Sequence, residues 1–119
     1  MHLEYITGAV GVAANDGITV SVLNHSDLNE SARVRIFMNT GAGAVQATDS
    51  GVYFLAPTWT GSIQFPVPNG GAHWVQVQAS SESVVVTAIF YKFVGSVLTP
   101  IAHYSPGDFA VFERGRRQR

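Results

Sequence analysis

Four histidines are the side chains of this 119-residue chain best suited to acid–base chemistry or metal binding. They are His2, His25, His73 and His103, and no two of them have the H-x-H or H-x3-H spacing of a ligand pair. A zinc site needs three or four ligands that converge from the fold. Cysteine is absent, which excludes disulfides, thiolate ligands and cysteine nucleophiles. We therefore expect histidines at the surface or rim and no metal site.

A serine hydrolase needs a serine, a histidine and an acid, and the sequence holds two such groupings. One is the His-Ser-Asp run at 25–27, and the other lies within residues 103–108. Spacing is weak evidence here, because the triad is recognised by its geometry. No G-x-S-x-G segment is present, and the Ser-Pro-Gly-Asp run at 105–108 is typical of a turn. Neither grouping predicts a hydrolase.

Acidic and glycine-rich segments add no further chemistry. The carboxylates fall mostly in predicted loops or at strand ends, whereas a glycosidase needs two that face each other across a cleft. The Gly-Ala-Gly-Ala run at 41–44 has neither the lysine nor the following helix of a phosphate-binding loop, so it predicts a hairpin turn. We expect a protein that is not an enzyme and that uses no cofactor.

Three aromatic residues are candidates for contacting a ligand. Trp59 follows a proline in a predicted loop, Trp74 points away from its apolar neighbours Val75 and Val77, and Tyr91 lies in a predicted strand. Aromatic side chains exposed on a flat sheet suit carbohydrate or protein binding. The other interpretation is that they close the core of the domain. A carbohydrate- or protein-binding module is therefore the alternative function.

Basic charge is concentrated at the end of the chain. Four of the seven basic residues stand in the last six positions, whereas residues 1–113 carry 3 basic and 8 acidic groups, a net charge of −5. The four are Arg114, Arg116, Arg117 and Arg119. This tail, residues 114–119, is a solvated end, a contact for a neighbouring acidic subunit, or a contact for nucleic acid as in a small virion or coat component. The absence of interleaved aromatic residues argues against nucleic acid as the partner.

The elements that position these residues are predicted to be strands. Apolar and polar residues alternate over 18–24, 32–39 and 72–79, which is the period of half-buried strands. Further strands are predicted over 52–56, 62–67, 97–104 and 109–112, with turn residues between them. Such spacing favours a single antiparallel β-sandwich, jelly-roll or Ig-like, of about eight strands over residues 17–113.

Individual strands also carry positional signals. Residues 84–93 are apolar on both faces, which predicts a central strand covered on both sides. Pro66 cannot donate a ladder hydrogen bond and predicts an edge strand. Asn69-Gly70 and Asp49-Ser50-Gly51 predict turns. The strands at 18–24 and 32–39 are predicted to form a hairpin-type pair.

Residues 1–16 are predicted to be a short strand or extended arm, since residues 3–7 alternate, followed by a glycine- and alanine-rich linker. Leu3, Tyr5 and Ile6 are the arm residues expected to contact a neighbouring subunit, by adding a strand to its sheet. The start has no basic segment followed by a long apolar run, so we expect no signal peptide and no membrane insertion. Synthesis in the cytoplasm follows, with the spore or cell surface as a candidate destination.

The surface composition favours self-association. Charged residues make up 13% of the chain, against about 25% in an average soluble protein. Charged side chains normally keep sheet edges from sticking to one another, and here they are sparse. We therefore predict a non-catalytic structural or assembly protein that binds copies of itself, as a homo-oligomer or filament, with carbohydrate as the second partner considered.

Three segments resemble small uncharacterised β-sandwich proteins of endospore-forming bacteria. They are Val20-Ser21-Val22-Leu23-Asn24, His73-Trp74-Val75-Gln76-Val77 and Tyr104-Ser105-Pro106-Gly107-Asp108-Phe109. The plan of an arm plus a sandwich is also similar to the subunits of spore-appendage filaments. That resemblance implies assembly into a fibre and no catalytic residues. The cysteines that cross-link those subunits have no counterpart here.

Overall fold

The computed structural model describes residues 2–40, 42–67 and 69–114, and for Arg114 the backbone only. The strands are β1 (His2–Ile6), β2 (Val10–Val12), β3 (Gly17–Asn24), β4 (Glu30–Thr40), β5 (Gly43–Leu55), β6 (Thr60–Pro66), β7 (Gly71–Ala79), β8 (Val84–Val94), β9 (Val97–Tyr104) and β10 (Ala110–Arg114). One 3-10 turn, η1 (Pro106–Asp108), lies between the last two strands.

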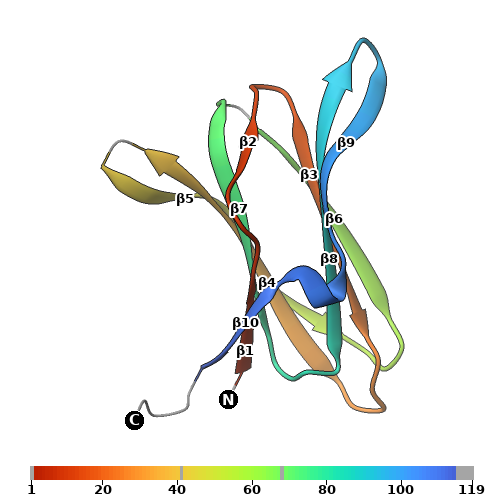
Figure 1. Cartoon of the computed structure of the whole chain (residues 1–119). Coiled ribbons are helices and arrows are strands. Elements are labelled where there is room, and N and C mark those ends of the chain that lie inside the picture. Colours follow the sequence, from red (N-terminus) through yellow and green to blue (C-terminus); the bar gives the residue numbers. More distant parts are fainter. Residues whose placement is uncertain (1, 41, 68, 115–119) are drawn as a thin grey trace.

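The strands form two antiparallel sheets that pack face to face (Figure 1). The six-stranded sheet has the order β10-β1-β7-β4-β5, with β2 also paired to β7. The four-stranded sheet has the order β6-β3-β8-β9. The predicted all-β sandwich is confirmed. The edge position predicted from Pro66 is also confirmed, since β6 pairs only with β3.

Alternation along four central strands makes the core. In β3 and in the central parts of β4, β7 and β8, every second residue is buried between the sheets, and the residues between them face outward. Ile18, Val34, Val75 and Phe90 are at most 2% exposed. Valine and isoleucine suit these positions because β-branched side chains pack well on a pleated surface.

An aromatic group fills one end of the core. The ring of Phe109 meets Tyr5 edge-on at 6.1 Å between centroids and lies 5.8 Å from Tyr104, which in turn lies 6.0 Å from Phe90. The predicted turn at residues 105–108 delivers Phe109 to this position: the Asp108 carboxylate accepts a hydrogen bond from Ser105 N (2.8 Å). Such ring contacts stabilise beyond the area they bury.

The arm expected over residues 1–16 is instead part of the sandwich. β1 lies between β10 and β7 in the six-stranded sheet, and β2 extends the same side of β7. Tyr5 is buried opposite Val77, and Thr7 continues the ladder by exchanging hydrogen bonds with Val75 (both 3.0 Å). The described domain therefore begins at residue 2 rather than at 17.

One predicted pairing is also wrong. β3 and β4 belong to different sheets, because the segment after β3 crosses the sandwich instead of turning back. The turn residues Asn69 and Gly70 lie in the connection from β6 in one sheet to β7 in the other. The hairpin turn predicted at 41–44 does connect β4 to β5, with Thr40 paired to Gly43.

The Asp49-Ser50-Gly51 segment is a bulge within β5 and not a turn between strands. The register against β4 shifts between Arg33 and Arg35, and Gly51 has φ +72°. The Asp49 carboxylate accepts a hydrogen bond from Gly51 N (2.9 Å), and Ser50 Oγ accepts one from Val34 N (2.9 Å). These turn-forming residues therefore form a β-bulge, in which β5 has one more residue than the facing part of β4.

Candidate binding surfaces

The outer face of the six-stranded sheet carries a row of polar and charged side chains. Glu4 on β1 accepts a hydrogen bond from Gln78 Nε2 on β7 (3.1 Å), although Glu4 is only 3% exposed. Arg33 on β4 forms an ion pair with Asp49 on β5, with the Arg33 Nε nitrogen 3.0 Å from Oδ1. These side-chain contacts link β1 to β7 and β4 to β5.

An aromatic pair lies on the same face. Phe37 on β4 and Trp74 on β7 stack with centroids 4.4 Å apart and planes at 14°. The Arg35 guanidinium carbon lies 5.7 Å from the Phe37 ring centroid, close enough for a cation–π contact. Next to this pair, Arg35 Nε and the nearly buried Gln76 Oε1 find no hydrogen-bond partner among the described residues.

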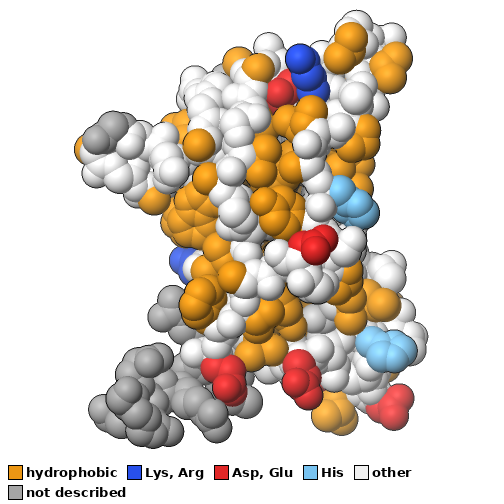
Figure 2. Space-filling model, viewed as in Figure 1, with side chains coloured by type: hydrophobic (Ala, Val, Ile, Leu, Met, Phe, Trp, Pro, Cys, Tyr) orange, Lys and Arg blue, Asp and Glu red, His pale blue; other side chains and the backbone are white. Residues whose placement is uncertain are grey.

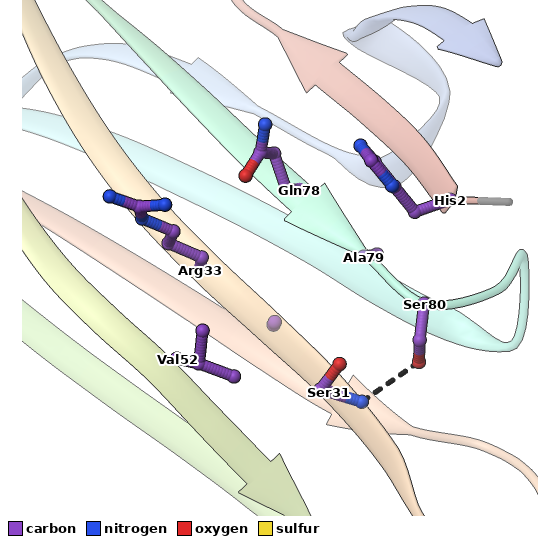
Figure 3. A pocket seen from close by; sticks show the side chains of 8 residues that line it. His2, Ser31, Arg33, Val52, Gln78, Ala79 and Ser80 are labelled. Carbon is purple, nitrogen blue, oxygen red and sulfur yellow. Dashed lines mark hydrogen bonds between the residues drawn. The ribbon is translucent and has the colours of Figure 1, made fainter. Parts of the chain in front are cut away.

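A pocket of about 320 Å³ opens on the lower part of this face (Figure 3). It is lined by His2, Ser31, Ala32, Arg33, Val52, Gln78, Ala79 and Ser80. Several of its polar groups already have partners within the chain. Arg33 forms an ion pair with Asp49, Gln78 donates a hydrogen bond to Glu4, and Ser80 Oγ accepts one from the backbone N–H of Ser31 (2.8 Å). The pocket therefore offers few free groups to a ligand.

The three predicted ligand-facing aromatics do not form one site. Trp74 is half-buried on the outer face of the six-stranded sheet, whereas Tyr91 lies in β8 of the four-stranded sheet, on the opposite side of the sandwich. Trp59 is 62% exposed in the loop between β5 and β6, and its carbonyl accepts a hydrogen bond from Asn24 N (2.9 Å). Each of the three belongs to a separate surface.

Tyr91 lines a groove of about 310 Å³ at one end of the four-stranded sheet. The groove is bordered by Thr19 and Gln64 as well as by the apolar Phe93 and Leu98. It lies at the base of the long hairpin made by β8 and β9, whose turn has Gly95 at φ +66°. Apolar atoms predominate in its lining, which also includes Asp16.

Large apolar side chains gather at the sheet edges. Figure 2 shows them along the open side of the sandwich and at the tip of the β8–β9 hairpin, where few charged groups stand among them. On β5, Phe54 is 81% exposed. The others on edge strands or on this hairpin are Val45, Val52, Tyr53, Phe93, Val94, Val97, Leu98, Ile101, Val111 and Phe112.

The predicted arm residues serve the fold of their own chain. Tyr5 is in the core, Leu3 packs against it, and Ile6 is half-buried beside Gln76 on the outer face. The Tyr5 side chain is therefore not available to a neighbouring subunit, and burial raises the pKa of its hydroxyl, with a smaller contribution from Glu82. Arg116, Arg117 and Arg119 of the predicted tail lie outside the described residues, and the Arg114 backbone ends β10.

The histidines and serines that suggested chemistry have local roles. His73 is in the core, against the expectation of a surface position, and its Nδ1 donates to the Gly71 carbonyl (3.0 Å). Ser26 Oγ donates to Asn24 Oδ1 (2.8 Å) in the loop after β3. In the part of the chain that the structure describes, no three histidine, aspartate or glutamate side chains are grouped to hold a metal ion.

Sequence reasoning missed Phe37 and Gln76. Phe37 lies two residues after Arg35 on β4, and Gln76 lies two residues after Trp74 on β7. The sequence assigns Arg35 and Trp74 to the face opposite the apolar residues of their strands. Strict alternation therefore predicts Phe37 and Gln76 there as well. Which of them would meet across the ladder depends on the β4–β7 register, which places Phe37 opposite Trp74 and Arg35 opposite Gln76.

The fold is similar to that of one solved protein. The crystal structure of Thermotoga maritima 1070, an uncharacterised protein, superposes with a TM-score of 0.60 over 82% of this chain and 87% of that chain, at 8% sequence identity. At this identity the likeness shows the fold alone. No family model and no curated protein matches the sequence. The resemblance to spore-appendage subunits stays a hypothesis.

No helix in the described part of the chain is long and apolar enough to cross a membrane.

Proposed function

We propose that this chain is a non-catalytic subunit of a homo-oligomer or filament, whose copies associate through apolar surface at the sheet edges and faces. One observation carries the proposal: three of the four edge strands, β5, β9 and β10, expose large hydrophobic side chains. Monomeric proteins rarely leave such surface uncovered. The extended N-terminal arm is not part of this proposal, because β1 completes the sheet of its own chain.

Edge protection is also sparse. Neither lysine nor arginine occurs in β5, β6 or β9, although basic side chains commonly prevent edge strands from pairing with other chains. Pro66 and Pro100 interrupt β6 and β9, and the register of β5 against β4 shifts twice. The free edges are therefore interrupted by prolines and by these irregularities, and not by basic side chains.

The test is the mass of the full chain in solution. Light scattering after gel filtration, and sedimentation velocity from low to high micromolar concentration, should give a multiple of the 12.7 kDa chain mass. Negative-stain images distinguish a closed oligomer from a filament. A strict monomer throughout this concentration range would overturn the proposal.

A carbohydrate-binding module is the second candidate, and one observation favours it. Beside the stacked Phe37 and Trp74 rings, Arg35 Nε and Gln76 Oε1 are an unpaired donor and acceptor, and a sugar hydroxyl can satisfy both kinds. Adding a panel of glycans should shift the fluorescence of a Trp59→Phe variant, in which Trp74 is the remaining tryptophan. No shift with any glycan, at concentrations that saturate typical lectins, removes this candidate.

A further inference from the structure

Strand β8 has the composition of a strand covered on both faces, but this chain covers only one. Its inward residues, among them Val84, Val86 and Phe90, are buried against the six-stranded sheet. Its outward residues include Val85 and Ile89, which are as apolar as the inward ones. Apolar residues on both faces are typical of a strand between two layers. No other strand of the described residues lies over the outward side of β8, so a second layer would come from elsewhere.

The outward positions around β8 hold no carboxylate, ammonium or guanidinium group. Every residue of β3, β6, β8 and β9 is described, and their one Asp, Glu, Lys or Arg is Lys92, an exposed residue of β8 that alternates with the outward Tyr91 and Phe93. His103 on β9 lies on the outward side, opposite Ile89. We call this surface the uncharged face.

Ser21 on β3 and Thr87 on β8 face each other at the centre of this surface. The Ser21 hydroxyl is hydrogen-bonded to that of Ser62 on β6, with 3.2 Å between the two oxygens. The outer face of the other sheet, by contrast, carries Arg33 and Asp49.

The size of the uncharged face fits a protein interface. Four strands at about 4.8 Å spacing, and about eight residues at about 3.4 Å each, give roughly 500 Å² of flat surface. A pair of copies would then bury roughly 1,000 Å² in total, which is close to the lower limit of a specific interface. This area is that of a flat face and leaves out the β8–β9 hairpin. The groove at Tyr91, about 310 Å³, occupies only one end of the face, so a small ligand would leave most of it open.

We propose that two copies of this chain pack their uncharged faces against each other across a two-fold axis. A two-fold axis places the same surface on itself, so any charge near the axis would meet a like charge. A face of Ser, Thr, Val, Ile and Tyr avoids that repulsion and leaves no ion without a partner. The inference rests on the proposed self-association and assigns it to one surface. The two sheets of the second copy would then form a third and a fourth layer on the sandwich.

The experiment places charge on that face and on a matched position elsewhere. Gln64→Lys combined with Thr87→Lys introduces two ammonium groups on outward positions of β6 and β8. Gln46→Lys is the control, because Gln46 is an exposed glutamine on the edge strand β5 of the other sheet. Circular dichroism and thermal melting verify that all three proteins fold.

We expect the double variant to raise the dissociation constant of the dimer by about 100-fold or more, since unpaired buried charges are costly. The Gln46→Lys protein should keep the mass of the unaltered chain. If the unaltered chain associates and the double variant associates equally well, this inference is wrong and the proposed function stands. If the unaltered chain is a monomer, both are wrong.

A second measurement keeps the inference testable if the lysine variant does not fold. The chain has no cysteine, so Thr87→Cys and Gln46→Cys each introduce a single thiol. Above the dissociation constant, a maleimide should modify Cys at position 46 quickly and Cys at position 87 slowly, and dilution should abolish the difference. Equal, fast modification of both at high concentration contradicts a covered uncharged face.

Discussion

At the scale of single residues, the Asp49 carboxylate shows how one side chain serves two contacts. It accepts hydrogen bonds from the Arg33 guanidinium on the neighbouring strand and from Gly51 N within its own bulge. The same carboxylate therefore stabilises the irregular backbone of β5 and links β5 to β4. Both donors favour its ionised form, which lowers the pKa.

The pKa of Asp49 should be measurably low. The hydrogen bond from Arg33, followed by that from Gly51 N, lowers it from 3.8 to about 2. The contribution of this ion pair to stability is then present above about pH 4 and is lost as the pH falls towards 2. Carboxyl carbon NMR should give a midpoint near 2, and Arg33→Gln should raise it towards 3.8.

The matched control for this titration is Arg35→Gln. Arg35 lowers the pKa of Asp49 only through a smaller long-range attraction, so its removal should move the midpoint less than removal of Arg33. A midpoint near 3.8 in the unaltered protein, or equal shifts in both variants, would contradict the assigned ion pair.

Asn24 is a second residue whose importance only the structure reveals. It is fully buried, and its Nδ2 donates to the carbonyls of Leu28 (2.8 Å), Leu55 (3.0 Å) and Ala56 (3.1 Å). Its Oδ1 accepts from Ser26 N (3.0 Å). In the sequence it is a polar residue at the end of a strand, which ordinarily predicts a loop. Buried backbone carbonyls need such donors, so Asn24 holds the loops on both sides of the core together.

At the scale of elements, β1 is a strand because of partners at the far end of the chain. It is five residues long and is followed by a segment rich in glycine and alanine, so local propensity is weak. Between β10 and β7, however, it has ladder partners on both sides, and Tyr5 joins the aromatic group in the core. Long-range pairing of this kind leaves no signal in the neighbouring sequence.

Deletion of residues 1–6 tests this position of β1. Because β1 is an interior strand, its loss exposes the Tyr5 site and leaves β10 without a partner. We expect loss of cooperative thermal unfolding, since removing a buried aromatic side chain alone costs about 3–5 kcal/mol. A truncated protein that melts cooperatively near the temperature of the full chain would show that the segment is a dispensable arm.

At the scale of the whole molecule, the distribution of charge distinguishes the two sheets. Ionic side chains occupy the outer face of the six-stranded sheet, while the outer face of the four-stranded sheet has none. The exposed apolar groups of the β8–β9 hairpin add to the second surface, whereas those of β5 and β10 lie at the edges of the six-stranded sheet. The association that we propose therefore depends on apolar and neutral polar contact rather than on ion pairs.

Salt dependence separates these two kinds of association. In about 1 M NaCl the screening length falls to about 3 Å, and contacts between exposed charges weaken. The mass of the assembly, measured by light scattering, should be the same in this buffer as at low salt. If high salt instead dissociates it, opposite charges hold the copies together, as expected for a basic tail on an acidic neighbour.

The sequence by itself determined the class of the fold, the faces of the strands and the absence of cysteine chemistry. Alternation put Val75 and Val77 on one face of their strand and Trp74 on the other, because side chains on a strand point to opposite faces. The packing of the two sheets made the valine face the inner one. Only the tertiary structure decided which strands pair, that β1 belongs to its own sheet, and that Trp59, Trp74 and Tyr91 lie on three separate surfaces. Those outcomes depend on contacts between residues distant in the chain, and a local pattern of side chains cannot specify its remote partner.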